Sequence, residues 1–207
     1  MTILSTSVLL AVSSGFGMAV VPVVQYLGDG RRRPWLLPVA ACGQTGLGLW
    51  SAAVVPAPWL PATLLLAWVL LSLALVDQID MRLPDALTLP LAGAGLLFSS
   101  GTAEMLAHGL GALIGYGALS ALAAGYRVWR GRDGIGQGDA KLIAAAGAWM
   151  GWEALPSVVV LASATALSVV AASRLFPGMP SAHDPIPFGP PLCFAIWMVW
   201  LYGPLLA

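Results

Sequence analysis

Two aspartates stand at the ends of long apolar stretches in this sequence. Asp77 follows the apolar run 64–76, and Asp139 follows Gly136-Gln137-Gly138. A carboxylate in or near membrane hydrocarbon is costly unless it is paired, protonated or hydrated, so such residues are candidates for function. Two carboxylates that share a site can hold one proton between them, so that one activates water while the other acts as an acid. The pair therefore predicts acid–base chemistry such as peptide hydrolysis, which needs no metal and no organic cofactor.

The composition indicates that most of the chain lies in a membrane. Hydrophobic residues make up 59% and charged residues 9% of the 207 residues, whereas a soluble domain carries about a quarter charged residues. The length allows about eight spans of roughly 20 residues and no sizeable soluble domain. We therefore expect an all-α fold, a polytopic transmembrane helix bundle that forms one domain over residues 1–207. The net charge of zero gives no indication of a nucleic-acid partner.

Apolar runs and helix-breaking residues divide the chain into about eight expected spans. These cover residues 4–27, 35–55, 61–77, 86–101, 106–126, 141–152, 155–174 and 187–206. All nine Lys and Arg residues then fall on one side, and the opposite side carries Glu104 and Glu153. By the positive-inside rule the basic side is cytoplasmic, which places both termini outside. Asp77 and Asp139 then lie at shallow depth in a hydrated notch on the cytoplasmic side.

Three acids lie near the end of the third expected span, and their positions distinguish them. Asp77 directly follows the apolar run, whereas Asp80 is expected to face water. Asp85 follows Pro84 and has the position of a helix cap. We therefore expect Asp77 to be the partner of Asp139.

Glycines and a lysine surround Asp139 in the sequence. Gly136 and Gly138 lack side chains, so a substrate backbone or a neighbouring helix could approach Asp139 closely. Gly-rich turns before helices are common, however, and Gly138-Asp139 could equally cap the sixth span. Lys141 is expected to extend to the membrane interface. Alternatively, its positive charge could favour the ionised form of the Asp139 carboxyl group.

The cysteines and tryptophans have simpler expected roles. Cys42 and Cys193 lie far apart in apolar runs, without any Cys-X-X-Cys pair, so we expect buried small hydrophobic residues rather than a disulfide or metal ligands. The tryptophans mostly fall at span ends, which predicts an interfacial belt. This set includes Trp35, Trp59, Trp129, Trp149 and Trp152.

Three motifs in this order resemble one protein family. They are Asp77 with Leu83-Pro84-Asp85 and Leu87-Thr88-Leu89-Pro90, then Gly136-Gln137-Gly138-Asp139-Ala140-Lys141-Leu142 with 147–151, then 186–192. The chain resembles the type IV prepilin peptidases, bacterial intramembrane aspartic proteases of the Gly-X-Gly-Asp type. The resemblance covers residues 60–205, and residues 1–55 match only loosely.

The resemblance implies an endopeptidase that removes the short leader of a prepilin or pseudopilin. The active site would face the cytoplasm from the bacterial inner membrane, and the partners would be a single-span substrate and membrane lipid. Asp77 and Asp139 would be catalytic. The supporting residues, taken from the matched motifs, would be Pro84, Asp85, Gly136, Gly138 and Lys141.

One part of the family pattern is absent from this sequence. Full-length members carry, between the first two spans, an insertion with two Cys-X-X-Cys pairs that binds zinc and accompanies methylation of the new N-terminus. The corresponding loop here is only residues 28–34, without a cysteine. We therefore expect peptidase activity without N-methyltransferase activity.

The sequence leaves two other functions open. Intramembrane acids also mark proton pathways, so a proton-coupled transporter could use Asp77 and Asp139 as a relay. Such a transporter should spread its acids through the membrane or contain an internal repeat, and neither is seen in the sequence. The chain could also be a catalytically silent factor in pilus assembly, although it retains both aspartates and both glycines. The peptidase hypothesis is favoured.

Overall fold

The computed structural model describes residues 3–28, 31, 33–99, 101–131, 136–175 and 187–205. Within these residues the chain forms eight α-helices, two short 3-10 helices and no strand, which confirms the expected all-helical class. The helices fall into two compact units, Met1–Asp80 and Met81–Ala207. Each unit is described by itself.

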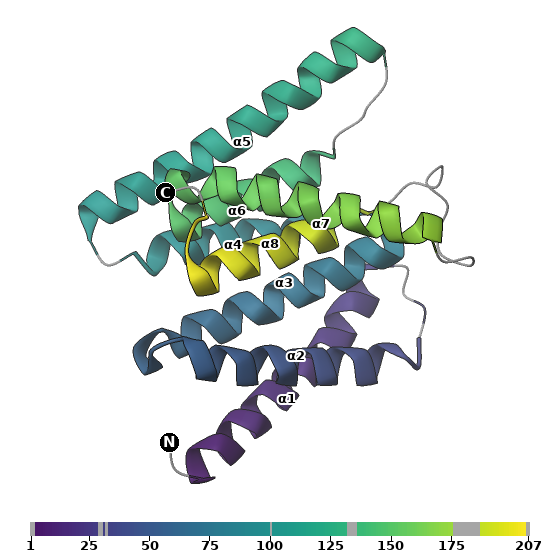
Figure 1. The fold of residues 1–207 in the computed structure, drawn as a ribbon. Coiled ribbons are helices and arrows are strands. Elements are labelled where there is room, and N and C mark those ends of the chain that lie inside the picture. The colour runs from purple at the N-terminus through teal and green to yellow at the C-terminus, as the bar shows by residue number, and fades with distance from the viewer. Residues whose placement is uncertain are drawn as a thin grey trace. The chain divides into compact units, whose positions relative to one another are not determined.

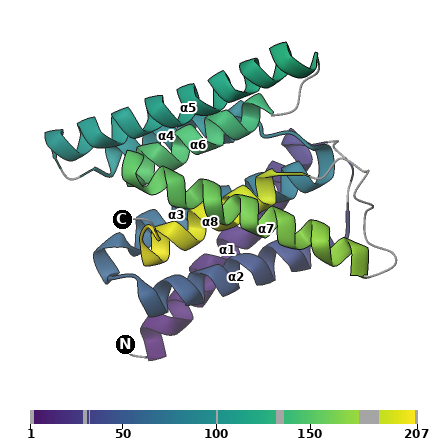
Figure 2. The same cartoon turned by 45° about the horizontal axis from the view of Figure 1, so that its top comes forward.

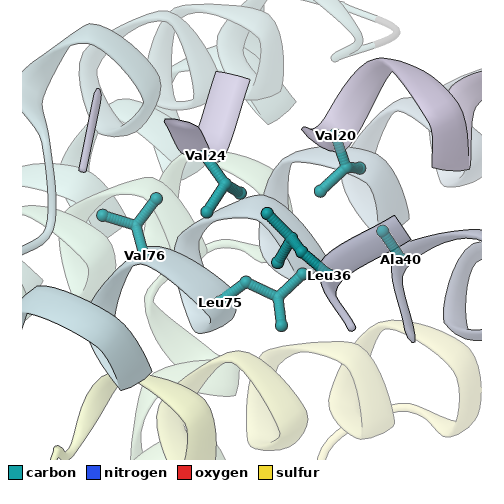
Figure 3. Packing of buried hydrophobic residues seen from close by; sticks show 6 residues of the cluster. All are labelled: Val20, Val24, Leu36, Ala40, Leu75 and Val76. Carbon is teal, nitrogen blue, oxygen red and sulfur yellow. The ribbon is translucent and has the colours of Figure 1, made fainter. Parts of the chain in front are cut away.

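Unit 1 contains α1 (Ile3–Leu27), α2 (Leu36–Val54) and α3 (Leu60–Asp80), with a 3-10 turn, Ala57–Trp59, directly before α3. Aliphatic side chains from all three helices pack into one buried cluster (Figure 3). The cluster consists of Val20 and Val24 from α1, Leu36 and Ala40 from α2, and Leu75 and Val76 from α3. Close approach supports this packing, because a Cβ added at Gly17 of α1 would lie 2.7 Å from the Cα of Ala41 in α2. Small residues at such crossings are typical of membrane helices.

Unit 2 contains the other five helices. They are α4 (Asp85–Leu97), α5 (Thr102–Arg130), α6 (Gln137–Met150), α7 (Leu155–Leu175) and α8 (Gly189–Tyr202), with a 3-10 turn, Trp152–Ala154, before α7. Figure 1 shows α5 running along α6, and α7 lies beside α8 in both ribbon views (Figures 1 and 2). Glycines with positive φ end three of these helices, Gly131 after α5 at φ 68°, Gly151 after α6 at φ 77° and Gly203 after α8 at φ 83°.

Glycines allow α6 to pack backbone against backbone on two sides. A Cβ added at Gly111 of α5 would lie 2.6 Å from the carbonyl oxygen of Gly147 in α6. On the α4 side, a Cβ added at Gly95 would lie 2.7 Å from the carbonyl oxygen of Ala148. Because real Cβ atoms do not approach other atoms this closely, these helix crossings require glycine.

Trp149 of α6 is a core residue, so the expectation that it belongs to an interfacial belt is wrong. Its side chain is 3% exposed, and its indole N–H donates a hydrogen bond of 2.8 Å to the carbonyl of Leu91 in α4. The residue stands one position before the end of α6, but the neighbouring helices cover it. The other four tryptophans named above are exposed.

Three described segments are long and apolar enough to cross a membrane. They are Ala57–Asp80, Thr102–Arg130 and Trp152–Ser173, and three shorter apolar helices accompany them, Ala11–Leu27, Asp85–Leu97 and Gly189–Tyr202. These helices fit a membrane protein.

Helix ends differ from the expected span ends where polar residues continue a helix. The fifth span was expected at 106–126, but α5 covers Thr102–Arg130. Likewise α3 continues to Asp80 instead of ending at 77, and α6 begins at Gln137 instead of 141. Hydropathy marks where side chains are apolar, whereas backbone hydrogen bonds continue through polar residues. Both aspartates therefore lie inside helices.

The two cysteines differ in their surroundings. Cys193 is buried, as expected, but Cys42 is exposed on α2. The expectation for Cys42 is wrong because a helix in lipid carries apolar residues on outward-facing positions too, so an apolar sequence context does not by itself indicate burial.

Candidate active site

Asp77 is a buried carboxylate near the C-terminal end of α3. Its exposed fraction is 6%. Leu75 and Val76, the two residues before it, belong to the packed cluster of unit 1 (Figure 3). Of the three acids compared in the sequence, Asp77 is thus the most buried, since Asp80 is half-buried and Asp85 is exposed. Its position is fixed by the packing of α1 and α2 against the last turns of α3.

Asp80 lies one turn after Asp77, against the C-terminal end of α1. A Cβ added at Gly28 would lie 2.6 Å from Asp80 Oδ2. This oxygen is buried and accepts no hydrogen bond from the residues that the structure describes. The expectation that Asp80 faces water is therefore wrong for this oxygen, because the end of α1 covers it.

Asp139 lies in the first turn of α6 and is half-buried. Gly136 is the N-cap residue of this helix, and its carbonyl accepts a hydrogen bond of 3.2 Å from the Asp139 backbone N–H. A Cβ added at Gly136 would lie 3.2 Å from Asp139 Oδ2. The first glycine of Gly-X-Gly-Asp therefore adds no side chain beside the carboxylate. The alternative that Gly138-Asp139 forms the helix cap is wrong, because the cap position is Gly136 and no side chain caps it.

Gly138 provides space for a segment of the same chain. A Cβ added at this position would lie 2.8 Å from the Cβ of Leu83. Leu83 belongs to residues 81–85, called here the 81–85 linker, which follow α3 and end on Asp85, the first residue of α4. The neighbour that approaches Asp139 at Gly138 is thus the linker. No sequence pattern predicts this contact, because a leucine in a Leu-Pro-Asp motif has no special spacing to a glycine 55 positions later.

Asp85 and Lys141 form an ion pair, and the expected role of Asp85 as a helix cap is wrong. Lys141 Nζ lies 2.6 Å from Asp85 Oδ1 and 2.7 Å from Oδ2. Asp85 does not cap α4, since it is the first residue of that helix and the N-cap position is Pro84. Lys141 reaches across to α4, and its extension to the membrane interface stays a prediction. The pair joins the start of α4 to the early part of α6.

Pro84 sets the start of α4. Its carbonyl accepts hydrogen bonds from the backbone N–H groups of Leu87, at 3.0 Å, and Thr88, at 3.2 Å. Proline suits this position because its fixed φ and missing N–H cost nothing before a helix begins. Pro84 thereby places Asp85 at the position from which it meets Lys141.

The five residues expected to support the site lie in the 81–85 linker and from Gly136 to Lys141 at the start of α6, all within unit 2. Asp77 belongs to unit 1. Of the resembling motifs, residue 186 lies outside the described residues.

The model of the type IV leader peptidase family matches residues 64–171, just over half of the chain. The matched region contains Asp77, the 81–85 linker, Gly136, Gly138 and Asp139. The chain belongs to the type IV leader peptidase family.

The chain is also similar to curated proteins that are named leader peptidases. Over 144 residues the chain is 42% identical to the prepilin leader peptidase/N-methyltransferase of Aeromonas salmonicida, covering 69% of this chain and 49% of the relative. It is 42% identical over 142 residues to the leader peptidase HopD of Escherichia coli, covering 68% of this chain and 92% of the relative. The chain spans about half the length of the first relatives that it matches. No solved structure matches it.

Proposed function

We propose that this chain is an intramembrane aspartic endopeptidase that removes the leader of prepilin or pseudopilin-like substrates at the cytoplasmic face of the bacterial inner membrane. The observation that carries the proposal is the presence of Asp77 and Asp139 in the family-matched region, one buried in an apolar helix and one in a glycine-flanked helix start. The relatives' names, which describe prepilin leader peptidases, support the substrate class.

In the proposed mechanism Asp77 and Asp139 act as a pair on one water molecule and one peptide bond. The ionised carboxylate takes a proton from water as the water oxygen bonds to the peptide carbonyl carbon. The protonated carboxyl donates a hydrogen bond to the carbonyl oxygen and later gives its proton to the leaving nitrogen as the C–N bond breaks. The space that Gly136 leaves beside Asp139 would admit an extended substrate backbone.

We also propose that the chain forms one peptidase domain that crosses the membrane about eight times, with both termini outside. Two observations support it. The family match begins in α3 of unit 1 and ends in α7 of unit 2, so the matched core needs both units. The basic residues also fall on one side of the expected spans, which supports an active site at the cytoplasmic face.

The proposal excludes N-methyltransferase activity. Several relatives are named for both activities, whereas HopD is named a leader peptidase. Residues 28–34 contain no cysteine, so a four-cysteine zinc site cannot form in that loop.

Co-expression with a candidate prepilin tests the dyad. Asp77→Asn and Asp139→Asn should each reduce leader removal at least about 1,000-fold, because the two carboxylates act as a unit. The control Glu153→Gln, at an exposed residue of the turn before α7, should cleave like wild type. Cleavage that survives in either Asn variant would overturn the dyad. If wild type cleaves no candidate but vesicles show proton movement that depends on both aspartates, the transporter hypothesis replaces the peptidase.

A further inference from the structure

The 81–85 linker contacts the beginning of α6 on both sides of Asp139 in the sequence. Leu83 meets Gly138, the residue before Asp139, and Asp85 meets Lys141, two residues after it. All of these residues belong to unit 2. The first turn of α6 is thus held by a segment more than 50 residues away in the sequence.

This external support matters because the first turn of α6 has little support of its own. Its N-cap is Gly136, without a side-chain hydrogen bond, and Gly138 is its second residue. Glycine gives the backbone more conformational freedom than any other residue and weakens a helix. The direction of the Asp139 carboxylate depends on this turn, since the side chain itself lies beside Gly136.

The ion pair is well suited to hold the turn. Lys141 Nζ contacts both Asp85 oxygens, at 2.6 Å and 2.7 Å, so its charge is directed at Asp85. The two side chains are 26% and 56% exposed for Lys141 and Asp85, and exposed pairs contribute little to overall stability. We therefore expect this pair to affect the position of the first turn of α6 more than the free energy of unfolding.

The second contact is steric and equally specific. Leu83 Cβ lies only 2.8 Å from the place where any residue other than glycine at 138 would put its own Cβ. The linker thus lies directly on the α6 backbone. Small displacements of a catalytic group reduce rates strongly, about 100-fold for 1 Å.

We propose that Asp85 and Lys141 are positioning residues for Asp139. Together with the Leu83–Gly138 contact, the ion pair holds the 81–85 linker on α6 and so sets the orientation of the Asp139 carboxylate. Lys141 acts through the α6 backbone and does not bind substrate. This inference rests on the proposed function, but its contacts can also be tested without cleavage.

Charge reversal of the pair provides the kinetic test, in full-length protein reconstituted in liposomes with a prepilin substrate. Asp85→Asn and Lys141→Met should each lower kcat about 10- to 100-fold while KM changes less than about threefold. The double variant Asp85→Lys/Lys141→Asp should recover most of the lost kcat, and Glu153→Gln should match wild type. A reversed pair as slow as the single variants, or single variants that raise KM at unchanged kcat, would overturn the positioning role.

A thermal unfolding cycle in detergent tests the contacts independently of activity. Gly138→Ala and Leu83→Gly should each lower Tm when made alone. In the double variant, Leu83→Gly should restore part of the Tm that Gly138→Ala loses, because it removes the side chain that the added methyl group meets. The matched control Gly93→Ala, in α4 with open space around it, should not lower Tm. Additive effects of Gly138→Ala and Leu83→Gly would contradict the linker contact. If wild type is inactive while the Tm effects of Gly138→Ala and Leu83→Gly are not additive, the proposed function is rejected and the linker contact stands.

Discussion

At the scale of single residues, Trp149 joins three helices of unit 2. Its indole N–H bonds to the Leu91 carbonyl of α4, and its ring meets Trp200 of α8 edge-on at 5.3 Å between centroids. Phe98, directly after α4, lies at 5.6 Å from the same ring. Aromatic pairs of this kind and a buried N–H bond each contribute on the order of 1 kcal/mol.

Trp149→Phe is therefore expected to destabilise the chain while preserving the apolar contacts. Loss of the N–H bond should cost about 1 kcal/mol, which corresponds to a fall in Tm of about 2–4 °C for a protein of this size. Thermal unfolding in detergent, followed by tryptophan fluorescence, measures the change. Trp129→Phe, at a residue that is 76% exposed, provides the control and should leave Tm unchanged. Equal shifts in the two variants would contradict the assigned hydrogen bond.

Some residues of the candidate site could be predicted from the sequence, and others could not. Asp77 and Asp139 could be selected because acids are rare in apolar surroundings, and the burial of Asp77 agrees with this selection. The Asp85–Lys141 pair could not be predicted, since its partners lie 56 positions apart and meet only after α4 packs on α6. Leu83 was missed for the same reason.

At the scale of helices, glycines decide where α6 packs. Gly111 faces Gly147 across the α5–α6 crossing, and Gly115 faces Ile143 one turn further along α5, where an added Cβ would lie 2.9 Å from that side chain. By contrast, Gly117 of α5 has open space around it. Hydropathy could predict that these helices exist, but helix ends and crossings depend on backbone hydrogen bonds and on contacts across the unit. The beginning of α6 before Asp139 is one example.

Gly147→Ala and Gly117→Ala should therefore have opposite effects. The first forces a methyl group into the α5 backbone and should cost about 1–3 kcal/mol. The second should be neutral or stabilise by up to about 1 kcal/mol, because alanine favours helix without a clash. Thermal unfolding of the two variants beside wild type measures the difference. A stable Gly147→Ala variant would contradict the close crossing.

At the scale of the whole molecule, charge asymmetry predicts the orientation in the membrane. The exposed end of α5, where Arg130 lies over the ring of Trp129 at 4.7 Å, belongs to the expected cytoplasmic side. Glu153, in the turn before α7, belongs to the opposite side. The sequence could predict this asymmetry because charge counts need no tertiary structure, whereas the exact number of crossings depends on how the shorter helices lie in the bilayer.

Cysteine labelling in intact cells tests the orientation. In a variant without Cys42 and Cys193, a membrane-impermeant maleimide should label Glu153→Cys in intact cells. It should label Arg130→Cys only after the membrane is opened. Labelling of both positions from outside, or the reverse pattern, would contradict the proposed topology.

The glycine crossings of α6 also bear on motion and on inhibition. At Gly147 the backbone of α6 lies directly against that of α5, and at Gly95 the backbone of α4 lies against the Ala148 backbone and the Trp149 ring, so rotation or sliding of α6 would bring these atoms into collision. Any rearrangement that admits a substrate is therefore expected in other parts of the chain. A small molecule directed at Asp139 would then meet nearly the same helix surface before and after a substrate enters, which makes the start of α6 a steady target for a drug.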